Sequence, residues 1–236
     1  MEHPVPEPPE LGEHNGLAYA LFLPPAAAEC GVVILPGAGS AKESHFDFAR
    51  GCRADGIAAL AVDPRGHGQS SGAFGPGAID DVLAMVALLR RHAACVALRG
   101  SSMGGFQAIH AAAADSSLSS VVAVCPAPET SLRRMLRSAE PLRFRCDVPA
   151  TERWLESLDL SAAAARLGPE TALLLLHARG DEQIPWTVSE DLHAAAHHPK
   201  RLLVLPGGNH RSLQHDLELH ALSRRWILDA ARGTVF

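Results

Sequence analysis

The sequence of 236 residues contains no C-x-x-C pair, and its cysteines are odd in number and scattered. The five are Cys30, Cys52, Cys95, Cys125 and Cys146. Without paired cysteines we expect neither a disulfide framework nor a zinc site, and we predict no metal and no cofactor. Cys95 and Cys125 lie in short apolar runs, where buried and unreactive thiols are typical. This cysteine usage favours a reducing compartment.

Two further absences limit the partners of the chain. No apolar stretch reaches the ~18 residues that a membrane-spanning helix needs, and the formal net charge is only -5. We therefore expect neither a membrane nor a nucleic acid as partner. Residues 1–10 are rich in proline and glutamate and lack the basic and apolar regions of a secretory signal. We expect residues 1–12 to be a mobile tail and the protein to be cytoplasmic, while its oligomeric state stays open.

Apolar runs alternate with helical patterns and predict a single α/β domain over residues 1–236. Short continuous apolar runs are typical of strands that are buried on both faces of a parallel sheet. These runs are 17–23, 31–35, 57–62, 95–98, 121–125, 172–176 and 201–205. Helical patterns occupy 44–55, 79–92, 103–114, 188–197 and 212–231. The alternation predicts right-handed crossovers and a mostly parallel sheet flanked by helices.

One segment interrupts this alternation. Residues 127–169 separate two predicted strands by more chain than a simple crossover needs. We expect helical turns within it, at residues 131–138 and 151–165. The segment is interpreted as a small helical cap inserted over the end of the sheet.

The strongest motif is Gly100-Ser101-Ser102-Met103-Gly104. It follows a predicted strand and opens a predicted helix, which is the context that G-x-S-x-G requires. A nucleophile on such a sharp turn needs neighbours without side chains, and the helix N-terminus offers N–H groups to a developing oxyanion. We therefore predict Ser102 as a nucleophile. Ser101 is adjacent but does not lie midway between Gly100 and Gly104.

A nucleophilic serine needs a base to accept its proton. Thirteen histidines are present, so the base has to be identified by its position in the chain. His210 follows the last predicted strand in a glycine-rich loop, at the end of the sheet where α/β proteins place their sites. We predict it as the base. His215 and His220 fall in the last predicted helix, where we expect them to face solvent, and His177 ends a strand and fits a structural role.

Asp181 is the predicted acid. It follows a strand and a glycine, and its carboxylate would accept the ring N–H of His210 and stabilise the imidazolium. The chain order of serine, aspartate and histidine is also the one found in α/β-hydrolases. Glu182 and Glu129 are the alternatives.

Together these segments resemble the α/β-hydrolase superfamily, near its monoglyceride-lipase, serine-aminopeptidase-like and dienelactone-hydrolase-like branches. The matching pieces are residues 35–40, 63–70 and 100–105 and the loops of Asp181 and His210. The motif assigns one oxyanion-hole N–H to Met103. The resemblance implies the second at Ala38, with Gly39 as the alternative. It also implies the α/β-hydrolase fold, with the cap inserted after the sixth strand of the sheet.

The chain departs from these relatives in three places. Pro36 stands where the family often has a histidine, so any contribution from that side chain is missing. Dienelactone hydrolases use a cysteine nucleophile, so Ser102 argues against that activity. The cap is short for a lipase that acts on long acyl chains.

Charged residues near the predicted site are interpreted as structural. Within residues 63–70, which resemble the family's D-x-R-G-x-G-x-S stretch, we expect Arg65 and His67 to hold a loop rather than touch substrate. The cap carries Arg133, Arg134, Arg137, Arg143, Arg145 and Arg153. We interpret them as a solvated helix face, with Glu129–Arg133 and Arg137–Glu140 as local pairs. An anion-binding site is the alternative.

These observations predict a serine hydrolase, most simply a carboxylic ester hydrolase, that cleaves a small-molecule ester through an acyl-enzyme. An amidase or a perhydrolase would use the same triad. A catalytically silent, hydrolase-like binding protein is the alternative from another class. Dinucleotide binding is disfavoured, because Lys42 stands where a G-x-G-x-x-G motif needs its last glycine.

Overall fold

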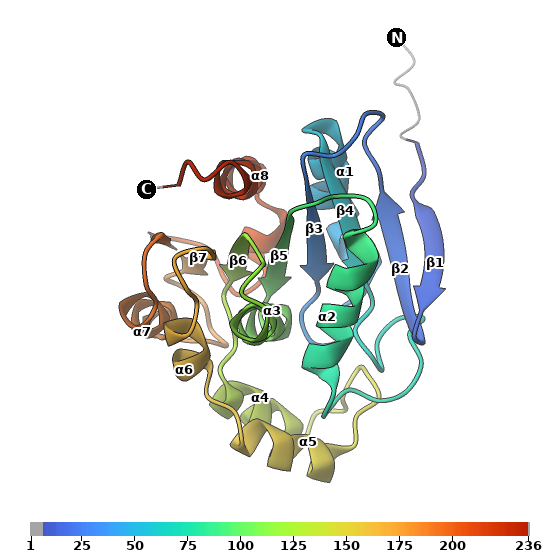
Figure 1. Cartoon of the computed structure of the whole chain (residues 1–236). Helices are drawn as coiled ribbons and strands as arrows, with labels where there is room; N and C mark the ends of the chain where they lie inside the picture. Colours follow the sequence, from blue (N-terminus) through green and yellow to red (C-terminus); the bar gives the residue numbers. More distant parts are fainter. Residues whose placement is uncertain (1–6, 236) are drawn as a thin grey trace.

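The computed structural model describes residues 7–235, which form an eight-stranded sheet with helices on both faces (Figure 1). The strands are β1 (Glu10–His14), β2 (Leu17–Phe22), β3 (Cys30–Leu35), β4 (Ile57–Val62), β5 (Val96–Ser101), β6 (Ser120–Val124), β7 (Ala172–Ala178) and β8 (Lys200–Leu205). They lie in the order β1-β2-β4-β3-β5-β6-β7-β8. The pairs β1–β2 and β2–β4 are antiparallel and all other pairs are parallel. The predicted mostly parallel sheet is confirmed.

Alternate residues of the strands build a core layer on each face of the sheet. Val33 and Leu35 of β3 belong to one layer, and Val32 and Ile34 to the other. The first layer is covered by α2 (Ala78–Leu89), α3 (Met103–Ala114), α6 (Leu160–Ala165) and α7 (Thr187–Ala195). The second is covered by α1 (Phe46–Ala54), which follows the short helix η1 (Lys42–His45), and by α8 (Leu217–Ala231). Among the helices of residues 7–235, none is long and apolar enough to cross a membrane.

The N-terminal prediction needs a correction. Residues 1–6 of the expected tail lie outside the described residues, but Glu10–Gly12 belong to β1, whose Glu10 is paired with Leu21. This strand lies at the edge of the sheet and most of its side chains are at least partly exposed. It therefore lacks the apolar run by which the buried strands were predicted.

The segment 127–169 divides into two parts. The helices α4 (Glu129–Leu136) and α5 (Val148–Glu156) lie beyond the carboxyl end of the sheet, at the bottom of Figure 1. By contrast, α6 packs against α3 and α7 in the helical layer. We therefore use "cap" for residues 129–156, the two helices and the loop between them.

The cap is joined to the loop that follows β4. The N–H of Phe74 donates to the carbonyl oxygen of Arg145 (2.9 Å), and the N–H of Arg145 donates to that of Gly66 (3.0 Å). The ring of His67 stacks on Phe144 of the cap, with centroids 4.3 Å apart. His67 therefore holds the loop against the cap, which agrees with the structural role expected for it.

Candidate active site

Ser102 occupies the sharp turn between β5 and α3, with φ 52° and ψ -116°. Gly100 and Gly104, two residues before and after Ser102, leave the room that this turn needs. A Cβ built on Gly100 would lie 2.0 Å from the carbonyl oxygen of Gly104, and one on Gly104 would lie 2.1 Å from that of Leu35. The N–H of Ser102 donates to the carbonyl oxygen of Val124 (2.9 Å), so the end of β6 fixes the turn.

The side chain of Asp181 is fully buried after β7 and receives hydrogen bonds on both oxygens. Oδ1 accepts the N–H groups of Gln183 (2.9 Å) and Ile184 (2.8 Å). Oδ2 accepts from Nδ1 of His210 (2.8 Å) and lies 3.3 Å from Nε2 of His177. Burial alone would raise the pKa of Asp181, but the hydrogen bonds outweigh it and hold the pKa well below its usual value. Asp181 is therefore an ionised acceptor.

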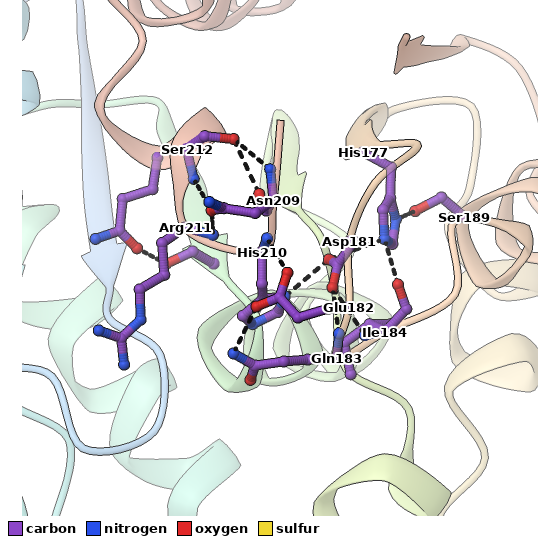
Figure 2. Close-up of polar contacts among 12 residues, drawn as sticks. His177, Asp181, Glu182, Gln183, Ile184, Ser189, Asn209, His210, Arg211 and Ser212 are labelled. Carbon is purple, nitrogen blue, oxygen red and sulfur yellow. Dashed lines mark hydrogen bonds and ion pairs between the residues drawn. The ribbon is translucent and has the colours of Figure 1, made fainter. Parts of the chain in front are cut away.

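His177 is a member of this group that the sequence placed only as a structural residue. Its Nε2 faces two acceptors, the Ile184 carbonyl oxygen (3.1 Å) and Oδ2 of Asp181, so this nitrogen must carry the proton. Nδ1 then accepts from the hydroxyl of Ser189 (2.7 Å). Figure 2 shows His177 and His210 on opposite sides of Asp181. The position of His177 was visible in the sequence, four residues before Asp181, but its partners were not.

His210 lies on the loop after β8, and its backbone N–H donates to Oε2 of Glu182 (3.1 Å). Since its Nδ1–H is donated to Asp181, Nε2 carries the lone pair. Neither this Nε2 nor the hydroxyl of Ser102 has a hydrogen-bond partner within residues 7–235, and both residues line the same cleft. Ser102, Asp181 and His210 therefore line one cleft, but the hydrogen bond expected between the hydroxyl of Ser102 and the ring of His210 is not formed.

The loop of His210 continues into the short helix η2 (Ser212–His215), which is hydrogen-bonded to β5. The carbonyl oxygen of Gln214 accepts from Nε2 of His220 (2.6 Å), and its side-chain oxygen accepts from the hydroxyl of Ser101 (3.3 Å). His220 is 1% exposed, so the expectation that it faces solvent is wrong. It lies on the inner face of α8, which packs on the sheet.

The cleft has a volume of about 1050 Å³. Its walls are residues 37–40 after β3, helix α4 of the cap, and the loops after β7 and β8. Ala38 lies in this wall, and Met103 directly follows Ser102. Within residues 7–235, neither the Ala38 N–H nor the Met103 N–H donates to any other group, so both are free to serve a ligand.

One set of side chains near the cleft has the donor types of a metal site. Sγ of Cys125, an oxygen of Asp181 and a ring nitrogen of His210 lie within 4.8 Å of one another. However, burial raises the pKa of the Cys125 thiol, and Asp181 and His210 already bond to each other. The donor set therefore does not suit a cation, and the absence of a metal stays a prediction.

The cap arginines pair differently from the expectation. Arg133 contacts Glu156 and Arg137 contacts Glu152, both on α5. The pairs predicted from i,i+3 and i,i+4 spacing are wrong, because α5 packs along α4 and presents acids to it. Glu129 instead lies 3.2 Å from the buried ring of His110.

Comparisons with known proteins identify the family and the fold of the chain. A family model described as serine aminopeptidase, S33, matches residues 26–157, which is more than half of the chain. A curated relative, the uncharacterized protein YfhR of Escherichia coli K12, is 50% identical over 38 residues. That match covers 16% of this chain and only 13% of the relative.

Solved structures show the same fold over nearly the whole chain. Est1E from Butyrivibrio proteoclasticus, with ferulic acid bound, superposes with a TM-score of 0.73 at 17% identity, covering 96% of this chain and 99% of that one. A monoacylglycerol lipase of Paleococcus ferrophilus gives 0.73 at 20% identity, covering 91% and 99%. A monoglyceride lipase variant of Saccharomyces cerevisiae gives 0.75 at 13% identity, covering 100% and 97%. The predicted α/β-hydrolase fold is confirmed.

Proposed function

This chain belongs to the serine aminopeptidase S33 family of α/β-hydrolases, and from that premise we propose that it is a serine hydrolase which cleaves small esters through an acyl-enzyme. One observation carries the proposal. A buried, ionised Asp181 binds Nδ1 of His210 at 2.8 Å, and the free Nε2 of that ring shares a cleft with the unbonded hydroxyl of Ser102. This is the set of groups that activates a serine.

In the proposed reaction, Oγ of Ser102 bonds to the ester carbonyl carbon while Nε2 of His210 takes its proton. The N–H groups of Ala38 and Met103 bind the resulting oxyanion. The C–O bond to the alcohol then breaks, and the alcohol leaves with the proton of His210. Water attacks the acyl-enzyme in the same way and releases the acid and free Ser102. Asp181 orients the ring and stabilises the imidazolium in both halves.

The alternatives receive less support. Glu182 binds the backbone N–H of His210 rather than its ring, and Glu129 is engaged with His110. A catalytically silent binding protein has no need of an unbonded serine in the same cleft as an oriented histidine. An amidase would use the same groups with an amine as leaving group, and a perhydrolase would use them with hydrogen peroxide in place of water. That the substrate is a small molecule, that no nucleic acid or membrane takes part and that the protein is cytoplasmic stay predictions.

A fluorophosphonate probe is expected to label the native chain at Ser102, because phosphonylation needs a hydroxyl that a neighbouring base activates. Peptide mass mapping identifies the labelled residue. Ser101→Ala, which removes the adjacent hydroxyl, is the matched control and should still be labelled. Undiminished labelling of Ser102→Ala would assign the nucleophile to another residue.

We expect kcat/KM to peak at short acyl chains and to fall for long ones. Leu132, Met135 and Ile184 are the large apolar side chains of the cleft wall, and Trp154 and Phe144 of the cap pack against the core instead. A tunnel for long chains would add about 0.8 kcal/mol of binding for each buried methylene. A series of p-nitrophenyl esters from acetate to palmitate measures this. Efficiency that rises out to palmitate would contradict it and point to a lipase.

A further inference from the structure

Three arginines line the cleft around Ser102: Arg134, Arg143 and Arg211. None of them forms an ion pair with a carboxylate of residues 7–235. Arg134 donates to a backbone carbonyl oxygen, that of Gln183 (2.7 Å), and the side chains of Arg143 and Arg211 make no hydrogen bond within the described chain. By contrast, Arg133 and Arg137, which lie outside the cleft on the same cap, pair with acids of α5.

Two of the three arginines, Arg143 and Arg211, lie next to the proposed reacting groups. Arg143 lies against the proposed oxyanion loop, since a Cβ on Gly39 would be 3.0 Å from Cβ of Arg143. Arg211 directly follows His210, and Figure 2 shows its side chain on the side of His210 away from Asp181. A ligand group that reaches either guanidinium therefore lies close to an ester held at Ser102.

The charge of the cleft has to be considered as a whole. Besides the buried Asp181, Glu140 and Glu182 also line it. Glu182 accepts from the N–H of His210 (3.1 Å) and the side-chain amide of Gln183 (3.3 Å), which are uncharged donors, and Glu140 forms no ion pair within residues 7–235. The cleft lining therefore carries three carboxylates and three guanidinium groups, and the proposal depends on the places of the arginines rather than on an excess of positive charge. The guanidinium groups are the main unpaired donors of the wall, and a guanidinium binds carboxylate and phosphate oxygens in pairs.

We propose that the substrate carries an anionic oxygen group, a carboxylate or a phosphate, which Arg143 and Arg211 bind while the ester lies at Ser102. The inference rests on the proposed hydrolase function and names its substrate class. It also revises the interpretation of the cap arginines as a solvated helix face. Arg134 and Arg143 line the cleft, whereas the other cap arginines lie outside it.

Two pairs of esters test the proposal and separate the two anions. Monomethyl adipate is compared with methyl hexanoate, and 1-butyryl-glycerol 3-phosphate with monobutyrin, by titrating the released acid. In at least one pair we expect kcat/KM of the anionic ester to exceed that of the neutral ester at least about tenfold. One charge-assisted hydrogen bond produces an effect of this size. The preference should shrink as salt is raised, because the guanidinium groups are exposed.

Arg143→Gln and Arg211→Gln are each expected to lower the anionic-to-neutral ratio of kcat/KM several-fold. Arg153→Gln is the matched control, since it removes the same charge from the cap outside the cleft and should leave the ratio as it is. Equal or lower kcat/KM for both anionic esters, with the neutral esters cleaved and Ser102 labelled, would overturn this inference alone. A preference that survives both cleft variants would overturn the assignment to these arginines. Absence of both labelling and ester cleavage would instead overturn the proposed function.

Discussion

Replacing Ser102 by glycine is expected to abolish turnover and at the same time to stabilise the fold. Loss of the nucleophile should lower kcat about 10⁶-fold, as removal of a triad serine does elsewhere. The backbone of Ser102 has φ 52° and ψ -116°, which costs a residue with a Cβ roughly 1–3 kcal/mol. Glycine adopts this conformation without that strain, but it loses about 0.5–1 kcal/mol more conformational entropy on folding. A net gain of about 1 kcal/mol remains.

Ser102→Ala separates the two effects. It removes the hydroxyl but keeps the Cβ, so it should be as inactive as Ser102→Gly without the gain in stability. For a domain of this length, about 1 kcal/mol corresponds to a rise in Tm of roughly 2–4 °C, which calorimetry resolves. A glycine variant no more stable than the alanine variant would show that the turn stores no strain. Residual turnover in either variant above about one hundredth of wild type would contradict the role of the hydroxyl.

The parts of this site that could be predicted from the sequence are those fixed by short-range sterics. Gly100 and Gly104 were expected to leave room for a sharp turn, and the distances of 2.0 Å and 2.1 Å from their hypothetical Cβ atoms to backbone oxygens confirm it. The strands 31–35 and 57–62 were predictable for a similar reason, because burial on both faces leaves an apolar run in the sequence itself.

The parts that were missed depend on contacts between distant segments. The pairing of Arg133 with Glu156 and of Arg137 with Glu152 requires α5 to pack along α4. Burial of His220 requires the sheet beneath α8. Neither arrangement leaves a pattern in the local sequence. Helical spacing therefore predicted partners for the arginines within one helical turn, and it predicted that His220 faces solvent.

A second large effect is expected from Asp181→Asn, because every group at the Asp181 carboxylate is a donor. The N–H groups of Gln183 and Ile184 reach Oδ1, and the imidazoles reach Oδ2. The backbone donors cannot reverse, so the single oxygen of asparagine must stay on their side and its NH₂ must face His210. The ring can then only accept at Nδ1. Its proton moves to Nε2, which no longer accepts one from Ser102.

The same variant should change the pH dependence of stability. The folded pKa of Asp181 lies below its unfolded value, which is about 3.9 for aspartate. Ionised Asp181 therefore stabilises the fold above about pH 4, and this contribution is lost as pH falls toward the folded pKa. Asp181→Asn lacks it. The difference in unfolding free energy between wild type and Asp181→Asn should consequently shrink from about pH 5 to about pH 2 in urea titrations.

For turnover, we expect Asp181→Asn to lower kcat about 10⁴-fold, with the chain still folded, as an amide does when it fixes the wrong tautomer of a triad histidine. The fluorophosphonate reaction of Ser102 should slow in parallel, since it needs the same base. Glu182→Gln is the matched control: it removes one negative charge at the next residue, which binds the backbone N–H of His210 and the side-chain amide of Gln183 but not the ring of His210. Its kcat should fall by less than about tenfold, because loss of a bond to the backbone leaves the tautomer of the ring unchanged. If the two results were exchanged, Glu182 would be the acid and the buried aspartate only a support for its loop.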